Sequence, residues 1–456
     1  MENNLFNEFE PVSSQQWKQQ IQYELKGADY NEVIWESPEG IKVKPFYHAD
    51  NFENKITVST NASKFKIVQD IFVHDVAKSN SRALNCLSRG AESIRFTIET
   101  EDTDIEKLLL QLPLNKVPVY FILNFLSDTF IKKIDALASK NQDALFFVQL
   151  DPIGKLATEG NWFHSLEKDF EIINNISLSC NHIHFLSINS SLYQNAGANT
   201  VQQIAYTLAH TNEYFNRMAT IQKPVVLQVA AGANYFFEIA KLRAMRLLFG
   251  LIAKEYGHDL ECHIIASPTK RNKTLYDYNV NMLRTTTECM SAILGGADAV
   301  YNLPYDALYH KSNEFGDRIA RNQLLVLKHE SYFDKTDNPA DGSYYIETLT
   351  HQLAEKALEL FKEIEASGGF LRQLKEGTIQ RKIQESALKE QELFESGKEI
   401  LLGTNKYPNK NDRMSHDLEL YPFVKTKARK TLITPVIEKR LAEKIEQDRL
   451  ASEKEA

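Results

Sequence analysis

His182 and His184 are a pair of residues whose types and spacing could hold a metal ion. The spacing of two places both imidazoles on the same side of a strand, and imidazole is a common zinc ligand. The pair lies at the N-terminal end of a predicted strand, however, and no third ligand is nearby. We therefore interpret both as ordinary surface histidines rather than as a zinc site.

His74, Asp75 and Asp151 stand at the C-terminal ends of predicted strands, where acid–base chemistry is sterically reasonable. Each is followed by a helix-length segment, and Asp is a preferred N-cap residue. We favour helix caps and loop hydrogen bonds over catalysis at these positions. Neither G-x-G-x-x-G nor G-x-x-x-x-G-K-[ST] occurs, so no nucleotide-phosphate motif is present.

Eight short β-rich runs alternate with helix-length segments over roughly half of the chain. Most of the runs are apolar almost throughout, which is typical of parallel strands covered on both sides. Such a rhythm of eight β/α units predicts an α/β fold of the (β/α)8 TIM-barrel type, although a doubly wound sheet stays open as an alternative. The predicted strands are 66–73, 93–99, 117–125, 145–151, 184–191, 224–231, 261–267 and 299–304.

The chain is predicted to have three parts. Residues 1–60 lack the barrel rhythm and form an arm whose Trp17, Trp35 and Phe46 need another surface, on the barrel or on a partner chain. Residues 61–346 form the barrel. Residues 347–456 form a C-terminal helical region and tail.

Composition and charge exclude several classes of protein. The 456 residues are 43% hydrophobic and 25% charged, as in ordinary soluble proteins. A net charge of −8 argues against nucleic acid as a main partner. The acidic N-terminus does not resemble a signal peptide, and no apolar run is long enough to span a membrane. Four cysteines without a C-x-x-C pair indicate reduced, mostly buried thiols in a cytoplasmic protein.

The strand end at 189–192 offers little chemistry, although a TIM barrel keeps its active site at this end of its strands. It consists of Asn189, Ser190, Ser191 and Leu192, which include no general acid, general base or metal ligand. The sequence therefore raises the question of whether this barrel is catalytic.

Several segments, taken in order, resemble the cobalamin-dependent methylmalonyl-CoA mutase family. The match extends over nearly the whole chain, and the ordered set is specific although each segment alone is weak. The resemblance implies a TIM barrel that acts on acyl-CoA thioesters. The segments are Glu24–Gly27 with Glu39–Pro45, Gln194–Ala198, Asn234–Lys241 with Arg243, Asn281–Thr285, Gly295–Ala297, Arg318–Asn322, Asp341–Tyr345 with Glu347, and Gly403–Tyr407.

The departures from the family pattern are equally informative. Catalytic chains of the family have a Ser-Gly-Tyr-His-Met-Gln-Glu-Ala-Gly-Ala pattern at the fifth strand, and Leu192 stands at its histidine. Leucine can neither hydrogen-bond a thioester carbonyl nor move a proton. The Arg-Gln-Tyr-Ala-Gly run near the first strand, the Gln-Thr-Ser-Gly run near the seventh and the cobalt-ligating Asp-x-His-x-x-Gly motif are also missing. The residues left as candidates for a degenerate barrel mouth are Asp151, Asn189, Gln194 and Gln228.

This combination resembles the small (β) subunits of heterodimeric members of the family. The resemblance implies a non-catalytic chain that stabilises a large (α) subunit, while that subunit binds adenosylcobalamin and interconverts (R)-methylmalonyl-CoA and succinyl-CoA. It implies no cofactor, no metal and no cobalamin-binding Rossmann-like domain on this chain. Two alternatives stay open: an active acyl-CoA mutase chain whose cobalamin domain is a separate polypeptide, and a chaperone-like partner of the large chain.

Overall fold

The computed structural model describes residues 8–52, 57–58, 60–141, 143–218, 220–425 and 428–455. Eight parallel strands close into a barrel in the order β10-β3-β4-β5-β6-β7-β8-β9. This confirms the predicted TIM barrel and all eight predicted strands. Their bounds are β3 Lys66–Val73, β4 Ser93–Ile98, β5 Val119–Leu123, β6 Phe146–Leu150, β7 Ile183–Asn189, β8 Val225–Ala231, β9 Cys262–Pro268 and β10 Ala299–Val300.

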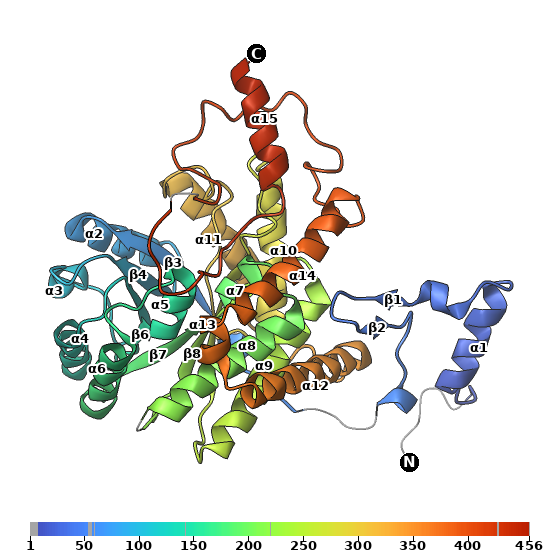
Figure 1. Cartoon of the computed structure of the whole chain (residues 1–456), viewed down its shortest axis with the longest axis horizontal. Helices are drawn as coiled ribbons and strands as arrows, with labels where there is room; N and C mark the ends of the chain where they lie inside the picture. Colours follow the sequence, from blue (N-terminus) through green and yellow to red (C-terminus); the bar gives the residue numbers. More distant parts are fainter. Residues whose placement is uncertain are drawn as a thin grey trace.

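Helices surround the barrel and cover the apolar outer faces of the strands (Figure 1). In α8, Ile204, Ala205 and Leu208 form an apolar stripe, and all three are buried. The bounds are α2 Val76–Ser88, α3 Ile105–Leu108, α4 Asp128–Lys140, α5 Pro152–Glu159, α6 Leu166–Ser179, α7 Ser191–Asn195, α8 Thr200–Arg217, α9 Tyr235–Glu255, α10 Val280–Leu294 and α11 Glu314–His329.

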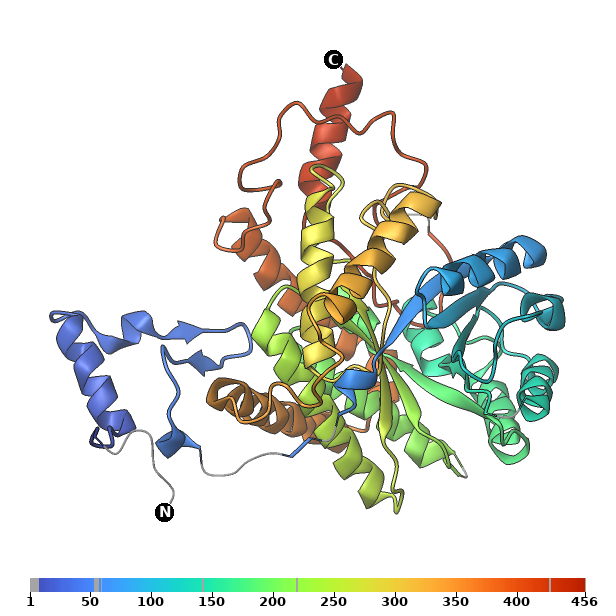
Figure 2. The same ribbon diagram turned by 180° about the vertical axis from the view of Figure 1, so that it is seen from behind.

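The N-terminal arm extends away from the barrel, and both views show α1 (Ser14–Glu24) at its far end (Figures 1 and 2). No residue of α1 is buried. The hairpin of β1 (Trp35–Glu36) and β2 (Lys42–Val43) ties the arm to the helical layer. Ile41 in its turn is only 2% exposed, and the Trp35 ring packs edge-on against Phe237 of α9 at 5.7 Å. The root of the arm is therefore fixed on the barrel helices, whereas its outer helix packs within the arm, where Trp17 lies edge-on to Phe46 at 5.7 Å.

The C-terminal region adds four helices: α12 Tyr344–Ala366, α13 Phe370–Lys375, α14 Thr378–Glu395 and α15 Glu443–Glu455. Helix α12 packs on α8 and α9. In helix α15, Glu446 accepts the backbone N–H of Leu275 at 2.8 Å and Glu453 accepts the hydroxyl of Tyr276 at 2.7 Å. This last helix thus packs on the barrel's own loops.

Two further observations bear on the class of protein. Cys86, Cys180, Cys262 and Cys289 are all free and buried, as the sequence predicts. Within the described residues, no helix is both long enough and apolar enough to cross a membrane.

Candidate site at the barrel mouth

The N-terminal half of the barrel axis is filled by aromatic rings. Phe147 of β6 stacks on His184 of β7 at 4.7 Å and on His263 of β9 at 4.5 Å. The Tyr120 hydroxyl of β5 lies 2.8 Å from His263 Nε2. Because β9 neighbours neither β5 nor β6, these contacts cross the interior of the barrel. The axis is therefore packed rather than open at this level.

The interpretation of both histidines as surface residues is wrong for His184. Its ring lies in the interior stack, and burial lowers the pKa of His184 to about 4. His182 lies just before β7, half-exposed, with Nδ1 3.3 Å from Asp135. Across the residues that the structure describes, no group of three or more His, Cys, Asp or Glu side chains is placed to hold a metal ion.

The C-terminal half of the axis is polar. Arg95 of β4 forms an ion pair with Asp70 of β3 at 2.9 Å, and its guanidinium lies 3.6 Å from the ring centroid of Tyr301. Gln149 of β6 is 5% exposed, and neither polar atom of its amide has a hydrogen-bond partner among the described residues. Buried amides are normally paired, so Gln149 is the most conspicuous polar group inside the barrel.

Asn189 and Gln228 lie together at the mouth, since they are paired residues of β7 and β8. The Gln228 amide donates to the Ser187 hydroxyl at 3.3 Å. Asn189 accepts a hydrogen bond from the Ser191 hydroxyl. The structure thus brings together three of the four candidate mouth residues, because Asp151 also accepts the backbone N–H of Asn189.

Both carboxylate oxygens of Asp151 accept hydrogen bonds from the surrounding chain. One carboxylate oxygen accepts from Gly154 N–H at 2.8 Å, which caps α5, from Tyr214 at 2.7 Å and from His210 at 2.9 Å. The other accepts the backbone N–H of Asn189 at 2.8 Å. Burial acts to raise the pKa of Asp151, but the His210 charge and these hydrogen bonds lower it overall. Asp151 therefore joins the ends of β6 and β7 and is not free for acid–base work.

Gln194 also faces inward, toward the helical layer. Its side-chain oxygen accepts from Lys241 Nζ at 2.9 Å, and its amide nitrogen donates to Glu238 at 3.2 Å. All three side chains are buried. Gln194 thus solvates a buried Lys–Glu pair between α7 and α9.

Leu192, in α7, is 1% exposed and belongs to the main apolar core. The neighbouring Tyr193 hydroxyl lies 2.8 Å from Nδ1 of the buried His210. Both nitrogens of that imidazole are therefore engaged, the other by Asp151. The His210 side chain is also fully buried.

Asp75 caps α2 through the backbone N–H of Lys78 at 2.8 Å. This confirms the interpretation of Asp75 as a helix cap, as the contact with Gly154 does for Asp151. His74 is exposed on the loop between the cap and β3.

Residues 428–442, here called the strap, run along the helices and loops that follow the C-terminal ends of β6, β7 and β9. Backbone hydrogen bonds join Leu432 and Ile433 to Gly160, Val436 to Ala157, Lys439 to Asn195, and Leu441 to Arg271. Gly160 has φ of +74°, and a Cβ there would lie 2.7 Å from the Ile433 carbonyl oxygen. The close approach of the strap therefore requires glycine at this position.

Polar side chains also hold the strap at the mouth. Asn195 donates to Glu438 at 3.0 Å and accepts from the Lys270 backbone at 2.9 Å. Glu438 in turn lies 3.3 Å from Lys270 Nζ. The family pattern has glutamate at position 195, which would face the Glu438 carboxylate. The asparagine of this chain avoids that repulsion and donates a hydrogen bond to Glu438 instead.

Sequence reasoning missed Arg95, Gln149 and Tyr301. A signal for the first two exists, because each is a single charged or amide residue within an apolar strand run, 93–98 and 146–150. It missed the strap altogether, because an extended segment without regular structure has no periodicity to detect.

Comparisons with known proteins agree on one family. The family model described as methylmalonyl-CoA mutase matches residues 97–452. The chain is 33% identical over 443 residues to the methylmalonyl-CoA mutase small subunit of Porphyromonas gingivalis, which covers 89% of this chain and 71% of that protein.

Two Streptomyces virginiae proteins are also similar. The chain is 30% identical to the methylmalonyl-CoA mutase small subunit, over 74% of this chain and 58% of that protein. It is 25% identical to the large subunit, over 87% of this chain and 62% of that protein. The chain thus spans about three fifths of the length of these two relatives. With its closed parallel barrel and these relatives, the chain belongs to the methylmalonyl-CoA mutase family.

Proposed function

We propose that this chain is a non-catalytic small subunit that stabilises the large subunit of an adenosylcobalamin-dependent methylmalonyl-CoA mutase. The observation that carries the proposal is the burial of Leu192 in the apolar core. The position at which the family's catalytic chains carry histidine has no polar atom here and no contact with solvent. Loss of a general acid–base group costs about 10²–10⁴-fold in rate.

The packed axis supports the same proposal. Phe147 lies within stacking distance of His184 and of His263 across the barrel. A long thioester cannot pass along an axis that is closed in this way. The substrates of the assembly, (R)-methylmalonyl-CoA and succinyl-CoA, are therefore assigned to the large subunit.

We assign adenosylcobalamin to the large subunit as well. The residues of this chain do not fit the cofactor, because the sequence has no Asp-x-His-x-x-Gly motif. Of the histidines near the mouth, His210 is enclosed by Asp151 and Tyr193. No step of the reaction is derived for this chain.

The arm is proposed as one contact with the large subunit, together with the C-terminal helices. Helix α1 exposes Trp17 by 49% and Tyr23 by 81%, and aromatic residues are enriched at protein interfaces. The free thiols of the chain suit a cytoplasmic assembly.

Co-expression with a cobalamin-binding large chain of the family, followed by size exclusion, tests the proposal. We expect the two chains to co-elute, and the variant Trp17→Ser with Tyr23→Ser to weaken the complex. Migration of this chain alone, with the large chain present and folded, would refute the proposed function.

One observation favours the second candidate, an acyl-CoA mutase chain whose cobalamin domain is a separate polypeptide. The unpaired amide of Gln149 and the Arg95 guanidinium both lie inside the mouth half of the barrel. Calorimetric titration with methylmalonyl-CoA separates the candidates. Heat that Gln149→Leu abolishes supports the second one, and no heat at saturating ligand supports the first.

A further inference from the structure

The strap is strongly basic although the chain as a whole is acidic. Its fifteen residues contain four basic side chains and one acidic side chain, Glu438, whereas the full chain has a net charge of −8. Of the four, Arg440 is buried and forms an ion pair with Glu446 at 2.6 Å. The other three, Arg429, Lys430 and Lys439, are exposed.

Little of this exposed charge is neutralised within the chain. Arg429 forms an ion pair with Glu159 of α5, and Glu438 is engaged by Lys270 and Asn195. In the part of the chain that the structure describes, Lys430 and Lys439 have no ion pair, nor has Lys425 just before the strap. The strap therefore presents a positive surface along the mouth of the barrel.

Two large aliphatic side chains stand out from the same segment. Leu432 is 70% exposed and Ile437 is 54% exposed, whereas Ile433 and Val436 between them are buried. The buried pair anchors the strap and directs the other two outward. Isolated exposed aliphatic residues are common, but here both flank unpaired cations on one segment.

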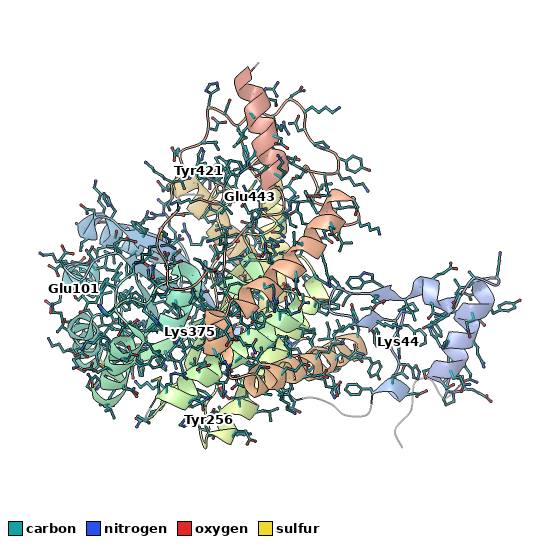
Figure 3. All side chains as sticks on the ribbon, viewed as in Figure 1. Lys44, Glu101, Tyr256, Lys375, Tyr421 and Glu443 are labelled. Atoms are coloured by element: carbon teal, nitrogen blue, oxygen red, sulfur yellow. The ribbon has the colours of Figure 1, made fainter. Side chains whose placement is uncertain are left out.

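The strap is also fixed in place before any partner binds. Its backbone is hydrogen-bonded to the segments that follow three strands. At its C-terminal end, Arg440 forms an ion pair with Glu446 of α15. In Figure 3, Tyr421 and Glu443 mark the chain just before and just after the strap. A surface that is ordered in advance loses little conformational entropy on association.

We propose that the strap is a docking surface for the large subunit, and that the large subunit meets it with an acidic surface containing apolar pockets for Leu432 and Ile437. This inference rests on the proposed function and adds a second contact, separate from the arm. Complementary charge favours an acidic partner. The aliphatic pair favours a protein over a free anion, since inorganic phosphate or a nucleotide phosphate makes no use of these side chains.

The test compares two charge-reversal variants in binding to the purified large subunit. The strap variant is Lys425→Glu with Lys430→Glu and Lys439→Glu. The control is Lys116→Glu with Lys133→Glu and Lys140→Glu, three exposed lysines without ion pairs among the described residues, in and near α4. Each triple reversal lowers the net charge by six, so the two variants are matched in total charge.

We expect the strap variant to associate at least about tenfold more slowly than the wild type at low ionic strength, and the difference to shrink as salt is added. The control should stay within about twofold of the wild type. Leu432→Ser with Ile437→Ser should dissociate about tenfold faster, since lost apolar anchors act on dissociation. Unchanged melting temperatures establish that all variants are folded.

Three results would overturn the inference. One is wild-type association by the strap variant, and a second is equal slowing by the strap and control variants. A third is binding of free coenzyme A that only the strap variant loses, with unchanged association of the subunits. Failure of the wild-type chains to associate would instead refute the proposed function itself, so the two failures are distinguishable.

Discussion

Replacement of Leu192 by histidine restores the residue that the family's catalytic chains carry, in a site that is now apolar. Leu192 is 1% exposed, and its full burial is worth about 2 kcal/mol. The neighbouring Tyr193 hydroxyl already bonds His210, and an imidazole left unpaired in this apolar core costs about 1–3 kcal/mol. We therefore expect Leu192→His to lower the free energy of unfolding by about 3–5 kcal/mol and to restore no activity.

Urea unfolding of the purified variant measures the loss, and a mutase assay with and without the large chain measures activity. Leu192→Met is the matched control, because it conserves volume and apolarity and should cost less than about 1.5 kcal/mol. A Leu192→His variant that is as stable as the methionine variant would refute the reasoning from burial. Activity gained by Leu192→His would show that the rest of a catalytic site persists in this barrel.

Three other perturbations test the structure. The imidazole of an unfolded chain titrates near about 6.5, whereas the folded pKa of His184 is about 4. The unfolded state therefore takes up a proton first, and the free energy of unfolding falls as the pH drops from about 6.5 to about 4. His184→Phe should remove up to about 3 kcal/mol of that loss, measured by urea unfolding at one pH above and one pH below this range. Asn195→Glu places a second carboxylate opposite Glu438, which should loosen the strap and speed its cleavage by trypsin. Adding Glu438→Gln should restore protection if the two side chains are coupled. Ile41→Ser loses about 2 kcal/mol of burial and should increase hydrogen exchange in residues 35–43 without changing exchange in the barrel strands.

The barrel could be predicted from the sequence because its strands are apolar almost throughout. A strand covered by helices outside and by side chains inside leaves a continuous signal, and even the two-residue β10 was found in this way.

The contents of the barrel could not be predicted in the same way. Whether His184 points inward depends on its pairing with Phe147 and on the register shift between β6 and β7, and neither is visible in one sequence. Asp151 and Gln194 are polar residues near strand ends, but long-range partners decide their roles. His210 is 59 residues from Asp151, and Lys241 is 47 residues from Gln194.

The rings that pack the barrel axis also bear on whether the stability of this chain depends on a ligand. A protein that keeps a ligand cavity is stabilised in proportion to the logarithm of ligand concentration, so its abundance follows the supply of the metabolite. Tyr120, Phe147 and His263 occupy the axis with the chain's own side chains. The chain itself therefore packs the barrel axis at this level, without a ligand. In the proposed role, such a chain can fold before its partner requires it, whatever the supply of substrate.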